Sequence, residues 1–495
     1  MTAALMVQGC GSDVGKSVLV AGLCRLFTNR GLAVRPFKSQ NMSNNAAVTG
    51  DGGEIGRAQA LQALACRVPP SVEMNPVLLK PQSDVAAQLI VRGRMAGTLE
   101  AGAYARDKQA LLGIAVECYH RLASQAQLMI VEGAGSPAET NLRRHDIANM
   151  GLAHALDLPV VLVGDINRGH VIAALVGAHV VLDEPDRARV RGFIVNKFRG
   201  SPELFEEGVR QICRLTQWPS LGVVPWLAAA ARLPSEDGVA LEEPDGSGTA
   251  SARVRIVIPQ FSRIANFDEF DALRAEPGVQ VEFVPPGRPL PAGAALIILP
   301  GTKATIADLG FMRAQGWDID LIAHVRQGGR VLGICGGYQM LGYQVSDPEG
   351  IEGPAQSVPG LGLLDATTLM SARKTLRAVS GVILPGRDSF SGYEMHVGST
   401  VGGALRRPLL ELADGNVDGA ITEDGRIAGC YVHGLFSTTA ARSALVASLG
   451  AQPARADHAV RVERALDEIA DALDRCLNIR MLMAIADLRL PVIDR

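Results

Sequence analysis

A single cysteine between an apolar run and two glycines restricts the fold of this chain more than any other feature. The run Gly329-Arg-Val-Leu-Gly-Ile334 is typical of a buried strand, and it ends at Cys335. Gly336 and Gly337 then permit a turn too tight for most side chains, and a helical pattern follows. Such an elbow exposes the sulfur and aims a helix N-terminus at it. Both effects favour the thiolate, which is the nucleophilic form.

A similar succession of strands and helices recurs along the chain. Short apolar runs bounded by glycine or polar loops alternate with amphipathic segments of helical length, the pattern of a mainly parallel sheet with helices on both faces. An acidic segment rich in proline and glycine at 232–252 is interpreted as an interdomain linker. We therefore expect two doubly wound α/β domains, at 1–231 and 253–450, and a charged helical tail at 451–495. The predicted strands lie at 4–7, 128–131, 159–163, 192–195 and 222–224, then at 254–258, 279–284, 295–299 and 331–334.

The composition excludes several classes of protein. With 495 residues, 47% hydrophobic residues and a formal net charge of −3, the chain has ample core and no general affinity for nucleic acids or membrane surfaces. No stretch approaches the roughly 18 apolar residues that span a bilayer, and the N-terminus lacks the basic region of a signal peptide. The eight cysteines are scattered with no Cys-x-x-Cys pair, which fits a reducing cytoplasm and excludes a clustered metal site.

A phosphate-binding loop is predicted close to the N-terminus. The segment Gly9-Cys-Gly-Ser-Asp-Val-Gly-Lys-Ser17 follows an apolar strand and precedes a helix. In such a loop the backbone N–H groups, including that of Gly15, cradle phosphates, Lys16 reaches the outer phosphates and Ser17 contacts Mg²⁺. Cys10 stands where the standard motif has glycine, and the loop is closer to that of dethiobiotin-synthetase-like enzymes. We expect ATP and Mg²⁺ as cofactors.

Two glutamates are candidate partners of the Mg²⁺ ion. Glu132 ends the apolar run 128–131 beside a glycine turn, at the edge where doubly wound sheets hold their ligands. Glu54, in Gly52-Gly-Glu-Ile-Gly-Arg57, is a further candidate; its alternative interpretation is a solvated residue at the start of a helix.

His433 is the expected base for Cys335. It lies in Gly429-Cys-Tyr-Val-His-Gly-Leu-Phe436, just past a short apolar strand and before a glycine. Imidazole can take the thiol proton and later protonate the leaving ammonia; the alternative is a buried structural histidine. The N–H groups of Gly301, at another strand end, and of Gly336 are the expected oxyanion donors.

Together these segments resemble the cobyric acid synthases, a family of glutamine-hydrolysing amidotransferases of cobalamin biosynthesis. The likeness covers nearly the whole chain and includes three further stretches, Pro36-Phe-Lys-Ser-Gln-Asn-Met-Ser-Asn-Asn45, Met74-Asn-Pro-Val-Leu-Leu-Lys-Pro81 and Asn196-Lys-Phe-Arg-Gly200. It implies an N-terminal P-loop ATPase similar to dethiobiotin synthetase, with Asn196 reading adenine, and a C-terminal class I glutamine amidotransferase. It also implies amidation of the b, d, e and g carboxylates of adenosylcobyrinic acid a,c-diamide, giving adenosylcobyric acid.

The group that orients His433 departs from the wider amidotransferase pattern. Many class I amidotransferases carry glutamate two residues after the histidine, and here that position is Leu435. This leaves either a Cys–His dyad or an orienting acid from elsewhere. Glu394 is the candidate acid; alternatively it pairs with His396, which shares its strand face.

Two other functions stay open at this point. A nucleotide-switch protein of the partitioning type would bind partners instead of making a product. However, such proteins carry an extra lysine where Cys10 stands, and a switch leaves Cys335 and His433 unexplained. Amidation of another carboxylate, such as the a and c side chains of cobyrinic acid or a cell-wall glutamate, would use the same residues. The expected partners are small molecules, namely corrinoid, glutamine and ATP, and a homo-oligomer is left open.

Overall fold

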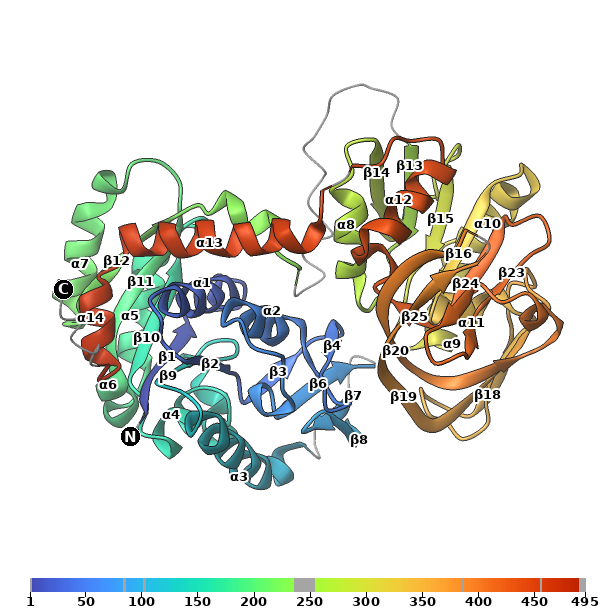
Figure 1. The fold of residues 1–495 in the computed structure, drawn as a ribbon. Coiled ribbons are helices and arrows are strands. Elements are labelled where there is room, and N and C mark those ends of the chain that lie inside the picture. Colours follow the sequence, from blue (N-terminus) through green and yellow to red (C-terminus); the bar gives the residue numbers. More distant parts are fainter. Residues whose placement is uncertain are drawn as a thin grey trace.

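Two α/β lobes lie side by side in the computed structural model of the chain (Figure 1). The structure describes residues 2–82, 86–100, 104–235, 254–384, 386–454 and 456–488. Most of the predicted linker, from 236 to 252, lies outside the described residues. Within them, no helix is long and apolar enough to cross a membrane.

The first lobe is built on a six-stranded sheet whose strands all run parallel. In its central strand, Leu5 and Val7 pack into one core while Ala4 and Met6 pack into another, because successive side chains point to opposite faces. Both faces are therefore covered, as the apolar runs predict. The strand order is β12 (Ser220–Pro225), β11 (Val190–Phe198), β10 (Val160–Asp165), β1 (Ala3–Gly9), β9 (Leu128–Glu132) and β2 (Val34–Phe37).

Helices from distant parts of the chain cover the two faces of this sheet. One face packs against α1 (Lys16–Asn29) and, from the far end of the chain, against α13 (His458–Cys476) and α14 (Ile479–Ile485). A Cβ at Gly22 would lie 2.6 Å from Ile469 Cγ2, so α1 and α13 approach closely because residue 22 is glycine. The predicted helical tail thus forms part of the first lobe's core. The other face packs against α3 (Tyr104–Ala123), α4 (Met150–Ala155), α5 (Val171–Val181) and α7 (Glu206–Thr216).

A β-rich insertion between β2 and α3 extends from the first lobe toward the second (Figure 1). The insertion contains the short helix α2 (Arg57–Ala65) and a small sheet. That sheet has the order β3 (Gln40–Met42), β6 (Val77–Pro81), β7 (Ala86–Val91) and β8 (Arg94–Glu100), beside the hairpin of β4 (Ala46–Val48) and β5 (Glu54–Gly56).

The second lobe is also doubly wound, which confirms the predicted fold class. Its sheet is parallel except for the edge strand β23. The order is β14 (Val279–Val284), β13 (Val254–Pro259), β15 (Leu296–Leu299), β16 (Arg330–Ile334), β24 (Ile427–Cys430) and β23 (Ala420–Ile421). One face packs against α8 (Asp271–Arg274) and α12 (Thr439–Ser448), and the other against α9 (Thr305–Ala314), α10 (Trp317–Arg326) and α11 (Gly336–Leu341).

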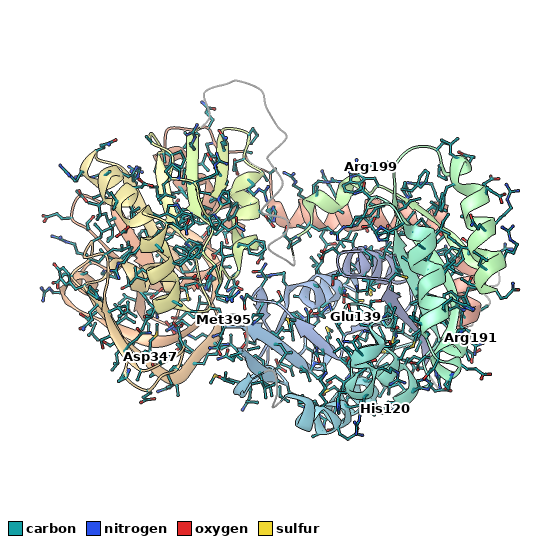
Figure 2. All side chains as sticks on the ribbon, turned by 180° about the vertical axis from the view of Figure 1, so that it is seen from behind. His120, Glu139, Arg191, Arg199, Asp347 and Met395 are labelled. Carbon is teal, nitrogen blue, oxygen red and sulfur yellow. The ribbon has the colours of Figure 1, made fainter. Side chains whose placement is uncertain are left out.

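A second, mixed sheet in this lobe faces the insertion of the first. Of this sheet, the sequence predicts only a strand that carries Glu394 and His396 on one face. A long hairpin of β19 (Thr367–Ile383) and β20 (Asp388–Val401) dominates the sheet, and β20 pairs with β25 (Val432–His433). Met395 of β20 lies where the two lobes meet (Figure 2). The sheet also contains β17 (Gln344–Asp347), β18 (Gln356–Pro359), β21 (Leu410–Leu412) and β22 (Val417–Asp418).

Candidate active sites

Cys335 lies at the turn between β16 and α11, as the glycine pattern predicts. Its backbone has a φ of 52° and a ψ of −109°, a strained conformation for a residue with a side chain. Its N–H donates to the Cys430 carbonyl at 2.8 Å. A Cβ at Gly337 would lie 2.1 Å from the Leu299 carbonyl oxygen, so the turn requires glycine at this position. These contacts fix the sulfur at the C-terminal edge of the parallel sheet.

His433 lies beside this turn and is held by a glutamate that the sequence analysis missed. His433 is 1% exposed, and its Nδ1 is 2.9 Å from Oε1 of Glu269. The other oxygen of Glu269 accepts the N–H of Gly434 at 3.0 Å. Glu269 belongs to the 3₁₀ helix η6 (Phe267–Phe270). Because Nδ1 is occupied, Nε2 is the ring nitrogen left to exchange a proton with Cys335.

Glu394 was the wrong candidate for the acid that orients His433. Its carboxylate instead forms an ion pair with Arg377 on the neighbouring strand. The pairing of Glu394 with His396 is not what the structure shows either, since His396 stacks on Tyr431 with ring centroids 3.7 Å apart.

The electrostatic surroundings make His433 a strong base. Burial by itself would lower the pKa of the imidazole, but the Glu269 carboxylate and the Cys335 sulfur raise it to about 10. Tyr393 stacks on the ring, with centroids 5.4 Å apart and planes 17° from parallel. The histidine is therefore fixed in position and tuned to bind a proton.

Gly301 and Gly336, the two glycines expected to provide oxyanion donors, both lie near Cys335 and His433. A Cβ at Gly301 would lie 2.7 Å from Cε1 of His433. A Cβ at Gly336 would lie 2.6 Å from Cγ2 of Thr302, the residue that follows Gly301. The Gly301 backbone therefore approaches the imidazole, and Gly336, which directly follows Cys335, approaches the strand end at Thr302. The donor role of their N–H groups stays a prediction.

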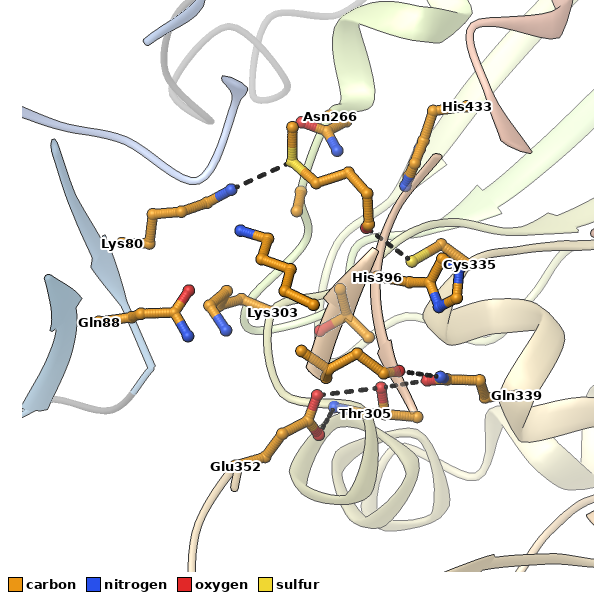
Figure 3. A pocket seen from close by; sticks show the side chains of 15 residues that line it. Lys80, Gln88, Asn266, Lys303, Thr305, Cys335, Gln339, Glu352, His396 and His433 are labelled. Atoms are coloured by element: carbon orange, nitrogen blue, oxygen red, sulfur yellow. Dashed lines mark hydrogen bonds between the residues drawn. The ribbon is translucent and has the colours of Figure 1, made fainter. Parts of the chain in front are cut away.

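Residues of both lobes line the pocket around Cys335 and His433 (Figure 3). Lys80 and Gln88 come from the insertion of the first lobe, and Lys303 and Glu352 from the second. Burial raises the pKa of Glu352 and lowers that of Lys303, while each partly offsets the shift of the other. The pocket thus offers groups of both charges next to the thiol, as an amino acid with an ammonium and a carboxylate requires.

The predicted phosphate loop joins β1 to α1 in the first lobe. Gly15 has a φ of 90°, and a Cβ there would lie 2.4 Å from Nδ2 of Asn196. That amide donates to the Val14 carbonyl at 2.8 Å, so Asn196 supports the loop backbone, and its contact with adenine stays a prediction. Lys16 donates to the carbonyl oxygens of Gly11 at 2.9 Å and Gly135 at 3.1 Å, across the mouth of the loop.

Glu132 lies next to this loop, at the strand end where it was expected. Its Oε1 accepts the Ser17 hydroxyl at 2.9 Å and the Lys38 ammonium at 2.8 Å, and its Oε2 accepts the Gln62 amide at 2.5 Å. Neither Lys38 nor Gln62 has a role predicted from the sequence. A hydroxyl and a carboxylate oxygen side by side fit the hard-oxygen preference of Mg²⁺.

Glu54 is not a metal ligand candidate in the structure. It is fully buried between the lobes and forms ion pairs with Lys80, at 3.0 Å, and with Lys374 of the second lobe. Burial by itself would raise the pKa of Glu54, but the two lysines lower it to about 2. Its charge is therefore already balanced, and it joins the insertion to β19.

Comparisons with known proteins match both lobes. Residues 5–239 match the model of the CobQ/CobB/MinD/ParA nucleotide binding domain, and residues 255–441 match that of the CobB/CobQ-like glutamine amidotransferase domain. A cobyric acid synthase from Caulobacter sp. (strain K31) is 63% identical over 487 residues, covering 98% of this chain and 99% of that protein. Those of Rhizorhabdus wittichii and Methylorubrum populi are 59% and 58% identical, covering 98% and 97% of this chain and 99% and 98% of theirs.

Proposed function

The chain belongs to the cobyric acid synthase family, and on this premise we propose that it amidates the b, d, e and g carboxylates of adenosylcobyrinic acid a,c-diamide. It is a glutamine-dependent ligase of cobalamin biosynthesis. In this proposal, glutamine supplies ammonia at Cys335 and ATP supplies energy at the phosphate loop. All eight cysteines are unpaired thiols, which supports a reducing cytoplasm as its compartment.

The geometry around Cys335 supports glutamine hydrolysis through a thioester. The thiol proton passes to Nε2 of His433, whose raised pKa favours this transfer, and the thiolate then attacks the γ-carboxamide carbon. Nε2 then passes that proton to the leaving nitrogen, the C–N bond breaks, and ammonia departs from a thioester. Water gives a proton to the same nitrogen and attacks the thioester; the C–S bond breaks, and glutamate and the thiol form. Glu269 stabilises the imidazolium in both steps.

The first lobe makes the acceptor carboxylate reactive. A carboxylate is a poor acyl donor, so it is phosphorylated by ATP, and ammonia then displaces phosphate. The backbone of the loop and Lys16 bind the transferred phosphoryl group and offset its charge. Mg²⁺, held by Ser17 and Glu132, would neutralise phosphate charge when bound.

One observation carries the proposal above all others. The pocket of the thiol is completed by Lys80 and Gln88, which belong to the lobe that holds the phosphate loop. Ammonia in neutral water is mostly ammonium, which cannot attack a carbonyl. A glutaminase pocket that opens against the ATP-binding lobe releases ammonia where it can be used without passing through solvent.

Mass spectrometry of the corrinoid tests the proposal directly. Adenosylcobyrinic acid a,c-diamide is incubated with the full-length enzyme, ATP, Mg²⁺ and glutamine. We expect a stepwise mass change for each acid-to-amide conversion, ending at adenosylcobyric acid. A parallel reaction with cobyrinic acid tests the a and c side chains as acceptors. An unchanged a,c-diamide would overturn the proposal.

A further inference from the structure

Helix α2 of the first lobe contacts the machinery of the other lobe through its first residue, Arg57. The guanidinium forms an ion pair with Asp268 of η6 at 2.8 Å and donates to the Tyr393 hydroxyl at 3.2 Å. A further bond joins the same surfaces, from the N–H of Ala46 to Asn266 Oδ1 at 3.1 Å. The ATP-binding lobe thus holds η6 at two points.

Both partners of Arg57 are next to His433. Asp268 directly precedes Glu269, the acid that holds Nδ1 of the imidazole. Tyr393 covers the face of the imidazole ring and lies opposite it in the pairing of β20 with β25. Burial raises the pKa of Asp268, and Arg57 is the main charge that opposes this shift. Without the guanidinium, the buried carboxylate would have to take up a proton or move, and η6 would move with it.

The same helix contacts the phosphate site. Gln62 lies five residues after Arg57, about 7.5 Å along the helix axis, and its amide donates to Glu132. Glu132 in turn accepts the hydroxyl of Ser17 in the phosphate loop. One short helix therefore contacts the surroundings of His433 at its start and those of the phosphates near its end.

We propose that Arg57 is a positioning residue for glutamine hydrolysis, supplied by the ATP-binding lobe, and that α2 couples the phosphate site to His433. Arg57 does not touch the reacting atoms; it acts through Asp268 and Tyr393. Glutamine is then hydrolysed efficiently only when the phosphate site is filled, which limits the waste of ammonia. This inference rests on the proposed function, because it assumes that both sites act in one reaction.

Arg57→Ala and Arg57→Lys in the full-length enzyme test the positioning role. Glutamate release measures hydrolysis, and amidation driven by ammonium salts with ATP measures the other lobe alone. We expect Arg57→Ala to lower the kcat for glutamine about 10- to 100-fold, with a much smaller change in KM, because it removes the ion pair with Asp268 and the hydrogen bond from the guanidinium to the Tyr393 hydroxyl. Arg57→Lys keeps the charge opposite Asp268 and recovers part of the loss. Ammonia-driven amidation stays unchanged.

Matched variants keep the inference falsifiable. Arg30→Ala removes another ion pair of the first lobe, with Asp474, and should change neither activity. Tyr393→Phe removes only the hydroxyl that Arg57 contacts and decides the question if Arg57→Ala fails to fold; we expect a several-fold lower kcat. Unchanged hydrolysis in the Arg57 and Tyr393 variants overturns the positioning role, and so does loss of ammonia-driven amidation along with hydrolysis.

The coupling has its own measurement. We expect ATP with the corrinoid to accelerate glutamine hydrolysis by the unmodified enzyme, and Arg57→Lys to weaken this acceleration. If ATP leaves hydrolysis unchanged, the coupling through α2 is wrong. If the unmodified enzyme does not amidate the corrinoid with either nitrogen source, the proposed function itself has failed, which is a different result from a selective loss in the Arg57 variants.

Discussion

Replacing Glu269 by glutamine is expected to slow glutamine hydrolysis about 100-fold while ammonia-driven amidation continues. The carboxylate accepts from the imidazole and from the Gly434 N–H, and it shares with Cys335 the effect that raises the pKa of His433 from 6.5 to about 10. At 1.36 kcal/mol per pKa unit, the whole rise corresponds to about 5 kcal/mol. Glu269 and Cys335 both contribute to this rise, so the expected loss is taken from the hydrogen bond itself. A hydrogen bond to a charged group is worth about 1.5–3 kcal/mol, and the upper end of this range is about two powers of ten in rate.

The assay compares three glutamate-to-glutamine variants under identical conditions. Glutamate release reports hydrolysis over a range of pH, and corrinoid mass reports amidation with ammonium salts. Glu394→Gln tests the acid that the sequence favoured. Its rate of glutamine hydrolysis should stay within about threefold of that of the unmodified enzyme, because the ion pair of Glu394 with Arg377 is partly exposed. Glu276→Gln breaks a buried ion pair with Arg442, so it should lower the melting temperature without a selective loss of hydrolysis.

The results that would refute this reasoning are specific. If Glu269→Gln hydrolyses glutamine at nearly the normal rate, Glu269 does not stabilise the imidazolium. If Glu394→Gln shows the large loss instead, Glu394 and not Glu269 orients His433 in solution. Equal losses in all three variants would indicate a general effect on folding.

Three more predictions concern the remaining parts of the molecule. Cys335→Ala should abolish glutamine use and keep ammonia-driven amidation, measured by corrinoid mass; loss of both would make the thiol structural. Glu132→Gln should abolish amidation with either nitrogen source, measured by phosphate release with the corrinoid present, and normal phosphate release would exclude Glu132 from the ATP site. The depressed pKa of Glu54, about 2 against 4.5, stabilises the fold above about pH 4.5 by about 3 kcal/mol. This contribution is lost as the pH falls from about 4.5 toward 2. In this pH range the melting temperature of Glu54→Gln should therefore fall less steeply than that of the unmodified protein. An equally steep fall of both melting temperatures would contradict the prediction.

The features that could be predicted from sequence are those encoded within a short stretch of chain. The elbow at Cys335, the loop at Lys16 and the strand-end position of Glu132 each follow from an apolar run and the glycines beside it. His433 was found for the same reason. Parallel strands end at a common edge, so residues placed at strand ends meet in space without any knowledge of the connections.

The residues that were missed or misjudged depend on contacts between distant parts of the chain. Glu269 holds His433 across 164 positions, and no periodicity marks it. The one local sign of Glu269 is that it lies with Asp268 between two aromatic residues, Phe267 and Phe270. This pattern indicates a turn with one buried side. Glu54 looked like a solvated or metal-binding carboxylate because its partner Lys374 lies 320 positions away. Charge pairing of this kind cannot be deduced from spacing.

The buried charges at the junction indicate that the two lobes stay together during turnover. Glu54 is paired with Lys374, and Arg57 with Asp268, so each lobe provides one charge of each pair. Separating the lobes would leave these groups without partners, and breaking a buried pair costs about 3–5 kcal/mol. Opening at every turnover would add that cost to each cycle and release ammonia into solvent. A junction that stays closed avoids this free-energy cost and the loss of ammonia. Signals between the two sites must then pass through small shifts of packed elements such as α2 and η6, and not through movement of whole lobes.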